Sequence, residues 1–310
     1  MTKSTSFTGQ TLIQVLKQVQ ETLKGRKVYN GWPMDERDIQ TRFEAETMLR
    51  YITGLSRTAF LTSLSQPLSD EQATWLAHAV ENRLQSMPLG YIVKTVNFYG
   101  FDFQVGPGCL IPRPETEILV DEAARWILQH IPNGHIYDLG CGSGIISIAL
   151  ALTCKESKVE AVDISADALQ IAKLNAAHLG ANVSFSHLDG LSDLKTRAVG
   201  KLNVLVSNPP YIPTADIQTL EPDVKDYEPH LALDGGVDGL FFYRSIFAMG
   251  DTMFESDSPA ALFFEVGIGQ ADLLLHELQD GLYPGFSNWS FGVHNDNRSV
   301  PRVLYGERIS

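Results

Sequence analysis

The sequence predicts an α/β protein in which helices cover a mainly parallel sheet with an antiparallel C-terminal edge, preceded by a small helical domain. Three observations lead to this prediction. Apolar residues recur at helical spacing over roughly residues 8–90, strand and helix patterns alternate after residue 134, and the tail from Trp289 reads as two strands joined by a loop. Such alternation favours parallel strands with helices on both faces of the sheet.

Residues 1–90 are expected to form the helical domain. The segment TLIQVLKQVQETL carries apolar residues at i, i+3, i+4 and i+7 from Leu12, which is the spacing of one helix face. The segment RFEAETMLRYITGL repeats this spacing with Phe43, Met48, Leu49 and Ile52, and Gly54 can terminate that helix. Ser69 is the N-cap candidate of a third helix, with acidic residues in its first turn.

Residues 91–112 are expected to form a β-hairpin that connects the two domains. The apolar period changes here from that of a helix to two, as in a strand. The residues that carry this alternation are Phe101, Phe103 and Val105.

Residues 113–310 are expected to form the main domain. Pro114 suits the first turn of its opening helix, and Glu115 and Glu117 are favourable near the positive end of the helix dipole. Strands are predicted at 135–139, 159–163, 183–188, 202–207 and 261–266, with helices at 145–152, 166–179 and 240–254.

Composition excludes some classes of protein. The chain has 37 acidic and 24 basic residues, a net charge of −13, whereas proteins that grip nucleic-acid backbones normally carry basic clusters. The three cysteines form no CxxC pair and the histidines lack the i, i+4 spacing of a helical zinc site, so no metal is expected. No signal peptide or apolar run of the ~18–20 residues that span a bilayer is evident, so we expect no membrane association and a cytoplasmic location.

The segment YDLGCGSGIISIAL predicts a strand, a glycine loop and the start of a helix. Gly140, Gly142 and Gly144 stand at GxGxG spacing, and glycine lets a ligand approach the backbone closely. The helix that follows offers free N–H groups to an anion. A dinucleotide site favours GxGxxG spacing, which would place a third glycine at position 145. This chain has Ile145 there, which disfavours a nicotinamide cofactor. Cys141 is interpreted as a small filler rather than a catalytic thiol, because no histidine lies nearby in sequence.

Two acidic residues follow at the ends of the next two predicted strands. The next predicted strand ends in the segment AVDIS. Asp163 lies in this segment about twenty residues after the loop, where a carboxylate can accept hydrogen bonds from ribose hydroxyls. Asp189 stands in HLDG at the next strand end. Either acid alone could equally be a helix N-cap or a solvated turn. Together they indicate a nucleoside site along the carboxyl ends of the strands.

The segment SNPPY, Ser207 to Tyr211, follows an apolar strand and is unusually rigid. Proline has no backbone N–H and cannot continue a sheet ladder, and it restricts the residue before it to extended geometry. A strand therefore ends here, with an amide, two carbonyls and an aromatic ring held at its tip. The alternative interpretation is a proline turn that only closes the strand.

The glycine loop, Asp163 and NPPY together resemble the class I S-adenosylmethionine-dependent methyltransferases. NPPY is similar to the signature of enzymes that methylate a planar nitrogen, either a glutamine amide or the exocyclic amine of adenine. The segments LIPRPETEILV and YEPHLALDGGVDGLFFYR resemble the peptide chain release factor glutamine methyltransferases in particular, and this likeness extends from about residue 40 to DNRSVPRVLYG. A sibling enzyme that methylates a ribosomal large-subunit protein shares NPPY but typically lacks the RPETE form of Arg113–Glu117.

The resemblance implies a Rossmann-like sheet, S-adenosylmethionine as the cofactor, and a set of site residues. Asn208 would lie beside both the cofactor and the substrate glutamine. Gly190 stands near the expected adenine position, where the family often has an aromatic residue. The implied cofactor-binding residues are Gly140, Cys141, Gly142, Ser143, Gly144, Asp163, Asp189, Gly190 and Asn208, and the implied catalytic residues are Asn208, Pro209, Pro210 and Tyr211.

The implied reaction is methyl transfer to the glutamine of the GGQ motif in class 1 peptide chain release factors. We expect the enzyme to be a monomer. We also expect its helical domain to recognise the body of the release factor, because a single glutamine offers too little surface for specificity. Four alternatives remain at this point. They are a glutamine methyltransferase acting on a ribosomal large-subunit protein, an adenine-N6 nucleic-acid methyltransferase, a nicotinamide-dependent oxidoreductase, and a binding module without activity. The net charge of −13 disfavours the nucleic-acid enzyme, which needs a basic groove and a base-flipping pocket.

Overall fold

The computed structural model of the chain describes residues 7–309, so the first six residues of the expected helical domain lie outside it. The chain divides into two compact units. We call the first the helical unit, which comprises Met1–Lys94 together with Glu221–Tyr227. We call the second the sheet unit, which comprises Thr95–Leu220 and Glu228–Ser310.

Within the described residues, the helical unit contains five α-helices from the N-terminal part of the chain and a short one from the second segment. They are α1 (Leu12–Leu23), α2 (Met34–Thr53), α3 (Arg57–Thr62), α4 (Asp70–Leu84), α5 (Leu89–Val93) and α10 (Pro222–Lys225).

In the part that the structure describes, the sheet unit contains nine strands and its own set of helices. The strands are β1 (Thr95–Phe98), β2 (Phe101–Gln104), β3 (His135–Leu139), β4 (Lys158–Asp163), β5 (Val183–His187), β6 (Val204–Ser207), β7 (Ala260–Glu265), β8 (Ser290–Asn295) and β9 (Pro301–Arg308). The α-helices are α6 (Thr116–His130), α7 (Ile145–Thr153), α8 (Ala166–Leu179), α9 (Gly190–Thr196), α11 (Phe241–Phe247) and α12 (Gln270–Gln279).

The predicted helices of the helical unit are confirmed, with one correction to the face that α2 buries. Gly54 ends α2 in the left-handed conformation, and the Ser69 side chain caps α4 by accepting from Gln72 N. Met48 is buried, but Phe43 is 58% exposed. The two residues are five positions apart, about 140° around a helix of 3.6 residues per turn, so they cannot share one narrow face.

A buried cluster of charges ties α10 to the other helices of the helical unit. The Glu44 carboxylate accepts hydrogen bonds from Arg83 Nη2 at 2.7 Å and from the Tyr29 hydroxyl at 2.8 Å. Asp223 accepts from Arg26 Nη2 at 2.8 Å and from Arg83 Nη1 at 2.6 Å. Both arginines and Glu44 are buried. Asp223 therefore completes the neutralisation of two guanidinium groups that water does not reach.

The predicted hairpin is present as β1 and β2, which pair antiparallel with Phe98 opposite Phe101. The extended prediction is wrong for residues 91–93, which belong to α5. Lys94 ends α5 in the left-handed conformation and turns the chain into β1.

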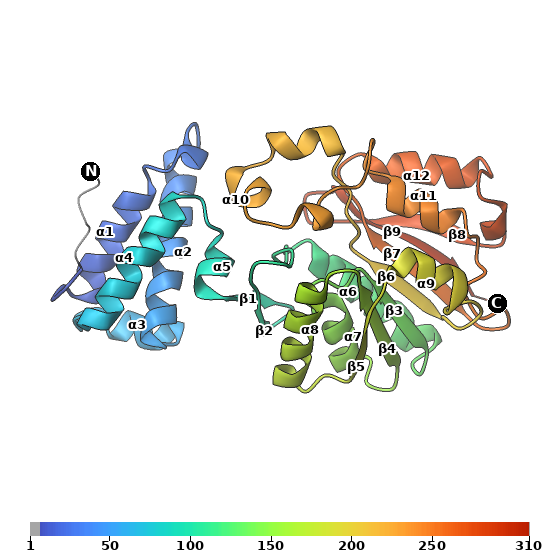
Figure 1. Ribbon diagram of the computed structural model, residues 1–310, viewed down its shortest axis with the longest axis horizontal. Coiled ribbons are helices and arrows are strands. Elements are labelled where there is room, and N and C mark those ends of the chain that lie inside the picture. The colour runs from blue at the N-terminus through green and yellow to red at the C-terminus, as the bar shows by residue number, and fades with distance from the viewer. Residues whose placement is uncertain (1–6, 310) are drawn as a thin grey trace. The chain divides into compact units, whose positions relative to one another are not determined.

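The main sheet has the strand order β5-β4-β3-β6-β7-β9-β8. The five strands from β3 to β7 run parallel, whereas β9 pairs antiparallel with β7 and β8 pairs antiparallel with β9. Figure 1 shows this sheet with helices on both sides. The α/β fold with a mainly parallel sheet and an antiparallel C-terminal edge is therefore confirmed.

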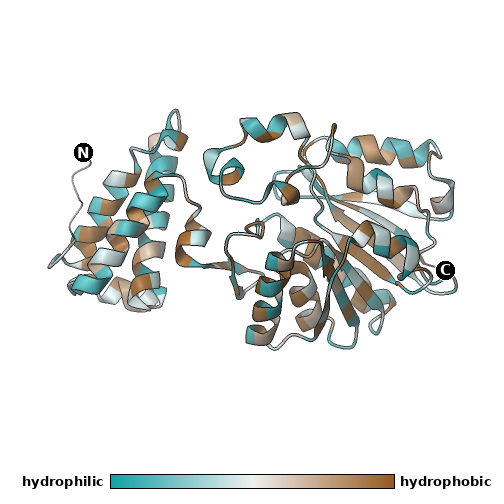
Figure 2. Cartoon of the chain, viewed as in Figure 1, coloured by the Kyte–Doolittle hydropathy of each residue, from teal (hydrophilic) through white to brown (hydrophobic). Residues whose placement is uncertain are grey.

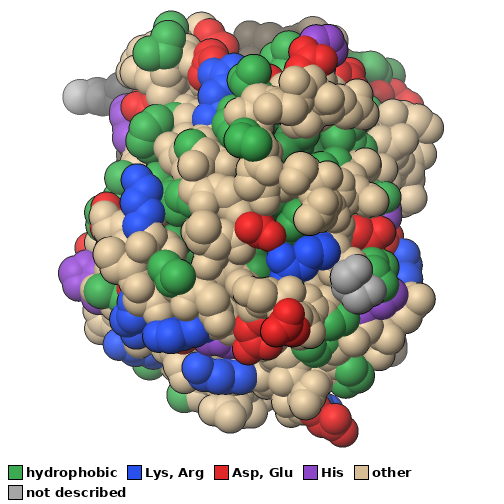
Figure 3. Space-filling view, turned by 90° about the vertical axis from the view of Figure 1, so that its right-hand side faces the viewer, with side chains coloured by type: hydrophobic (Ala, Val, Ile, Leu, Met, Phe, Trp, Pro, Cys, Tyr) green, Lys and Arg blue, Asp and Glu red, His purple; other side chains and the backbone are tan. Residues whose placement is uncertain are grey.

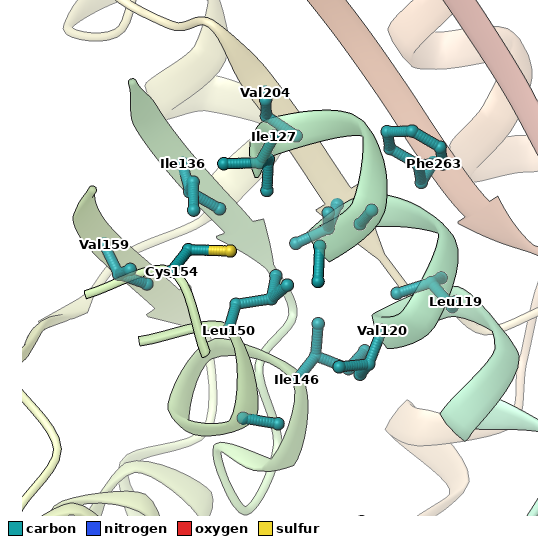
Figure 4. Close-up of a cluster of buried hydrophobic side chains, with 14 of the residues drawn as sticks. Leu119, Val120, Ile127, Ile136, Ile146, Leu150, Cys154, Val159, Val204 and Phe263 are labelled. Atoms are coloured by element: carbon teal, nitrogen blue, oxygen red, sulfur yellow. The ribbon is translucent and has the colours of Figure 1, made fainter. Parts of the chain in front are cut away.

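Both faces of the sheet are buried, because apolar side chains on successive strand residues point alternately to opposite faces. On one face Ile136, Val204 and Phe263 pack against α6 and α7, as Figure 4 shows. On the other face Tyr137 and Leu205 pack against α9, α11 and α12. The central strands β6 and β7 are accordingly mostly hydrophobic along their length, as the brown colour of these strands in Figure 2 shows.

Two predicted helix positions in the sheet unit are wrong. The helix predicted at 240–254 is α11, which ends at Phe247 because Gly250 takes a left-handed backbone. Pro114 lies before α6 rather than in its first turn, since Glu115 is the N-cap. Glu117 does lie in the first turn of α6, as expected.

The face in Figure 3 carries Lys and Arg side chains interspersed with Asp and Glu. Within residues 7–309, none of the helices is long and apolar enough to cross a membrane.

Candidate active site

The strand order creates a topological switch point between β3 and β6. From β3 the chain moves outward through β4 to β5, whereas from β6 it moves the other way to β7. Open α/β sheets bind ligands at such a point, beside the carboxyl ends of the strands. Ser207 Oγ at the end of β6 donates to Leu139 O at the end of β3, at 2.6 Å. The glycine loop and NPPY thus start from two strand ends that are hydrogen-bonded to each other.

The three glycines of the loop all have positive φ, from 56° to 83°. A Cβ on Gly144 would lie 2.9 Å from Ile148 Cδ1 and 3.1 Å from Ala172 Cβ, so this glycine permits close packing of α7 and α8. A Cβ on Gly140 or Gly142 would meet nothing within 4 Å. The backbone at these two positions therefore faces open space that a ligand could fill.

Asp163, at the end of β4, holds the glycine loop. Its Oδ2 accepts from Gly142 N at 2.7 Å, and its Oδ1 accepts from Ser165 N at 2.8 Å. Burial raises the pKa of Asp163, although these backbone hydrogen bonds oppose the rise. The carboxylate thus shapes the loop by its own contacts, and each of its oxygens has a second lone pair for a ligand hydroxyl.

Asp138 was not predicted as a site residue. It lies in β3 directly before the loop and is fully buried, with Oδ2 accepting from Ser147 N at 3.0 Å. Among the described residues, 7–309, its Oδ1 has no hydrogen-bond partner, and burial raises its pKa to about 7. The signal that could have revealed it is an acidic residue near the end of a short, mostly buried strand, two positions before the first glycine of the loop. An unsatisfied buried carboxylate oxygen is costly, and a cationic ligand group would satisfy it.

Asp189 and Gly190 have clear structural roles at the start of α9. Asp189 caps this helix by accepting from Leu191 N at 3.1 Å and from Ser192 Oγ at 3.0 Å. A Cβ on Gly190 would lie 2.0 Å from Leu139 Cδ1, so packing against β3 accounts for the absence of an aromatic side chain there.

Cys141 and Ser143, the two residues between the loop glycines, are both buried. Cys141 packs with Ala161 and Leu169, and burial raises the pKa of its thiol well above the usual range. A protonated, enclosed thiol fits the interpretation of Cys141 as a filler.

Asn175 on α8 is a second residue that the sequence did not reveal. It is fully buried, and its Nδ2 donates to Ser143 O at 2.9 Å. Its amide also pairs with the backbone of Gln104, through Oδ1 to N at 2.7 Å and Nδ2 to O at 3.0 Å. Asn175 therefore links the glycine loop to β2 of the hairpin.

Asn208 follows β6 directly, and its side-chain amide is oriented by α6. Asn208 Nδ2 donates to Thr116 Oγ1 at 3.4 Å, and Thr116 Oγ1 donates to Glu265 Oε2 at 2.6 Å. Thr116 and Glu265 are buried, whereas Asn208 is partly exposed. With its nitrogen engaged in this way, the amide leaves Oδ1 for another partner.

The far end of NPPY is fixed by Gln270 and by two glycines of the segment LDGGVDG. Gln270 Nε2 donates to Tyr211 O at 2.8 Å, while its Oε1 accepts from Gly267 N at 2.8 Å. A Cβ on Gly239 would lie 2.3 Å from Tyr211 O, and one on Gly235 would lie 2.8 Å from Pro210 O. The glycines let the two backbone segments approach closely, so NPPY is held rigidly at both ends.

Two family models match the chain. A "PrmC N-terminal domain" matches residues 36–93 and a "Methyltransferase small domain" matches residues 116–224. A release factor glutamine methyltransferase from Bacillus cereus is 37% identical over 82% of this chain and 90% of its own length. The enzyme of that name from Geobacter sulfurreducens is 40% identical over 86% of this chain and 89% of its own length.

Among solved structures, a release factor-specific protein-(glutamine-N5) methyltransferase from Alicyclobacillus acidocaldarius is 30% identical, with a TM-score of 0.42. The match covers 66% of this chain and 99% of that one. The extent of the identity to the Bacillus and Geobacter enzymes, across both units, confirms the resemblance that the sequence motifs indicated. The chain therefore belongs to the release factor glutamine methyltransferase family.

Proposed function

We propose that this protein transfers the methyl group of S-adenosylmethionine to the side-chain amide nitrogen of the GGQ-motif glutamine in class 1 peptide chain release factors. The observation that carries the proposal is the position of the Asn208 amide. It stands at the switch point of the sheet, beside the glycine loop, with its nitrogen engaged by Thr116 and its oxygen left for a substrate. Family membership supports the same reaction.

The residues around the glycine loop fit S-adenosylmethionine. The open backbone at Gly140 and Gly142 suits the methionine part, and the unpartnered Oδ1 of Asp138 suits its ammonium group. Asp163 has lone pairs available for the ribose hydroxyls. Asp189 and Gly190 stand at the next strand end, where the adenine would lie along the sheet edge.

When bound, S-adenosylmethionine supplies an electrophilic methyl group on a positively charged sulfur. The task of the protein is to aim a glutamine nitrogen whose lone pair is delocalised into its own carbonyl. Asn208 Oδ1 and the Pro209 carbonyl would accept the two N–H groups of the substrate amide and stabilise the positive charge that develops on nitrogen.

The prolines hold these two acceptors in place before the substrate arrives, and Tyr211 offers a flat face to the planar amide. The residues of NPPY need only aim the glutamine nitrogen at the methyl group, because the bound cofactor would supply that group and take up the electron pair of the broken S–CH3 bond. The methylated nitrogen is strongly acidic and releases one of its protons, so the site needs no strong base.

The test is methyl transfer to a purified class 1 release factor in the presence of S-adenosylmethionine. We expect the release factor to gain the mass of one methyl group, and peptide mapping to place it on the GGQ glutamine. A release factor with that glutamine replaced by asparagine is the control. If the enzyme methylated a ribosomal large-subunit protein, or adenine in DNA or RNA, and did not methylate the release factor, the proposed substrate would be overturned.

The proposal extends to the helical unit, which we assign to recognition of the release factor body by a monomeric, cytoplasmic enzyme. Ile39 and Phe43 support this assignment, because they are exposed, apolar and four residues apart on α2. Ile39→Glu with Phe43→Glu should raise KM for the release factor and leave cofactor affinity unchanged. Leu61→Glu, at an exposed leucine of α3, is the matched control. An unchanged KM in the double variant would contradict this role of α2.

A further inference from the structure

Glu265 is a buried carboxylate that the mechanism above does not use. It is the last residue of β7, the neighbour of β6, and only 3% of it is exposed. Its backbone carbonyl accepts from the fully buried hydroxyl of Tyr243 at 2.7 Å, which fixes its place at the strand end. A carboxylate is rarely buried without a specific partner.

The Glu265 carboxylate has hydrogen-bonding contacts with Thr116 and with Asn208, and the hydrogen bond from Thr116 has a defined direction. An ionised carboxylate only accepts, so the Thr116 hydroxyl must donate to Glu265 Oε2 along their 2.6 Å contact. The lone pairs of Thr116 Oγ1 then face Asn208, and only the NH2 group of that amide can donate to them, at 3.4 Å. The direction of both hydrogen bonds is thus set by the charge on Glu265.

We propose that Glu265, acting through Thr116, is a positioning residue that holds the Asn208 amide with its oxygen toward the substrate. This inference rests on the proposed function. Without the ionised carboxylate, the Thr116 hydroxyl could donate to Asn208 Oδ1 instead. The amide would then turn its NH2 group toward the substrate nitrogen, and two donors would face each other.

The surroundings of Glu265 make the hydrogen bonds among Glu265, Thr116 and Asn208 sensitive to pH. Burial raises the pKa of Glu265 to about 7, and the nearby carboxylate of Glu115 adds to the rise. Thr116, Arg302 and Asn208 oppose it by hydrogen bonding and charge. The phenols of Tyr211 and Tyr243 also face this carboxylate, and burial raises the pKa of both, so they stay neutral near pH 7. Turnover should therefore fall as the pH decreases through about 7, because Glu265 then gains a proton and can donate to Thr116.

The experiment is single-turnover methyl transfer to a class 1 release factor at saturating cofactor, from pH 6 to 9 (roughly the range that spans the pKa of Glu265). Glu265→Gln keeps the shape of the side chain but can both donate and accept. Thr116→Val removes the hydroxyl. At pH 8 we expect each variant to lose roughly tenfold to a hundredfold in rate, with cofactor affinity unchanged. The double variant should be no slower than the slower single variant, because both act through one contact.

Thr116→Ser, which keeps the hydroxyl, should restore most of the rate. In Glu265→Gln the rate of methyl transfer should no longer decrease as the pH falls below 7. Glu115→Gln is the control for charge alone, since Glu115 is nearby but makes no hydrogen bond to Thr116 in the described part of the chain. Wild-type rates in Thr116→Val would overturn the positioning role and leave the proposed function standing. Absence of transfer by the wild-type protein would overturn both.

Discussion

The two polar atoms of the Asn208 side chain have different tasks in the proposed site. The nitrogen anchors the amide to Thr116, and the oxygen receives the substrate. We predict that Asn208→Ala lowers the rate of methyl transfer by about 10²–10³, because a preorganised polar partner of the transition state is lost. Single-turnover transfer to a release factor, with calorimetric titration of S-adenosylmethionine in parallel, measures the two effects separately.

Asn208→Asp is the matched control for this prediction. Its carboxylate still accepts from the substrate amide, so it should be less damaging than alanine, although it loses the donor to Thr116. If Asn208→Ala kept a rate near that of the wild type, NPPY would be only a structural turn at the end of β6.

Asp138 provides a residue-scale prediction about stability. Its pKa is raised from the usual 3.8 to about 7 by burial, so the folded state keeps a proton that the unfolded state has lost. The contribution of Asp138 to the free energy of unfolding therefore decreases as the pH rises from about 4 to about 7. Asp138→Asn removes this titration, and relative to the wild type its free energy of unfolding should rise over that range by roughly 2–4 kcal/mol.

Chemical unfolding of both proteins at a series of pH values checks the Asp138 prediction. Every other buried acid is common to the two proteins, so the difference between their curves isolates Asp138. The same variant should bind S-adenosylmethionine more weakly, since the oxygen proposed to receive the ammonium group becomes an NH2 group in one orientation. Parallel stability curves would show that Asp138 does not titrate in this range.

At the scale of elements, the close approach of LDGGVDG to NPPY gives a prediction with an internal control. Gly239 and Gly281 have nearly the same backbone, with φ of 76° and 73°. A Cβ on Gly239 would lie 2.3 Å from Tyr211 O, whereas one on Gly281 meets nothing within 4 Å. Alanine at either position strains the backbone by about 1–2 kcal/mol. Only Gly239→Ala must also displace NPPY.

We therefore expect Gly239→Ala to lower kcat at least tenfold, while Gly281→Ala lowers the melting temperature slightly and leaves kcat unchanged. Misplacement of a reacting group by about 1 Å is enough for losses of this order. Equal kcat values in the two variants would show that the position of Tyr211 is not critical for turnover.

Local patterns in the sequence predicted most of the elements of the sheet unit. The glycine loop and NPPY mark the ends of β3 and β6, and short apolar runs bounded by turn residues located the remaining parallel strands. The prediction of a helix through residue 254 is wrong. Met253 and Phe254 are apolar at helical spacing, but they lie in a loop beyond Gly250, where their side chains are buried. Periodicity reports burial, and here it did not distinguish a helix from a buried loop.

The parts of the site that sequence could not reveal depend on contacts between distant segments. Thr116 and Glu265 are 149 residues apart in the chain, and neither belongs to a local motif that would suggest their hydrogen bond. Asn175 likewise reads as an ordinary polar residue of α8, although it joins the glycine loop to β2. The motif residues could be located from local chemistry, whereas the residues that hold them required the tertiary structure.

At the scale of the whole molecule, the charge cluster in the helical unit depends on a residue that is far away in the chain. Asp223 is about one-fifth exposed and neutralises Arg26 and Arg83 together with Glu44. We predict that Asp223→Asn lowers the free energy of unfolding of the helical unit by about 3 kcal/mol, because it leaves excess buried positive charge. Hydrogen exchange of α1, α2 and α4 measures this effect. Asp226→Asn, at an exposed residue just beyond α10, is the control, and equal exchange in both variants would contradict the prediction.

The chain enters the helical unit twice, first as its N-terminal part and again as Glu221–Tyr227. A single cut between Lys94 and Thr95 would therefore leave α10 seated among helices from the other fragment, and the two fragments should purify together. The same connectivity limits how the family can recombine. An exchange of the first 94 residues of this chain for those of a relative would remove Arg26 and Arg83 from contact with this chain's own Asp223, because the helical unit is built from two separate segments of the chain.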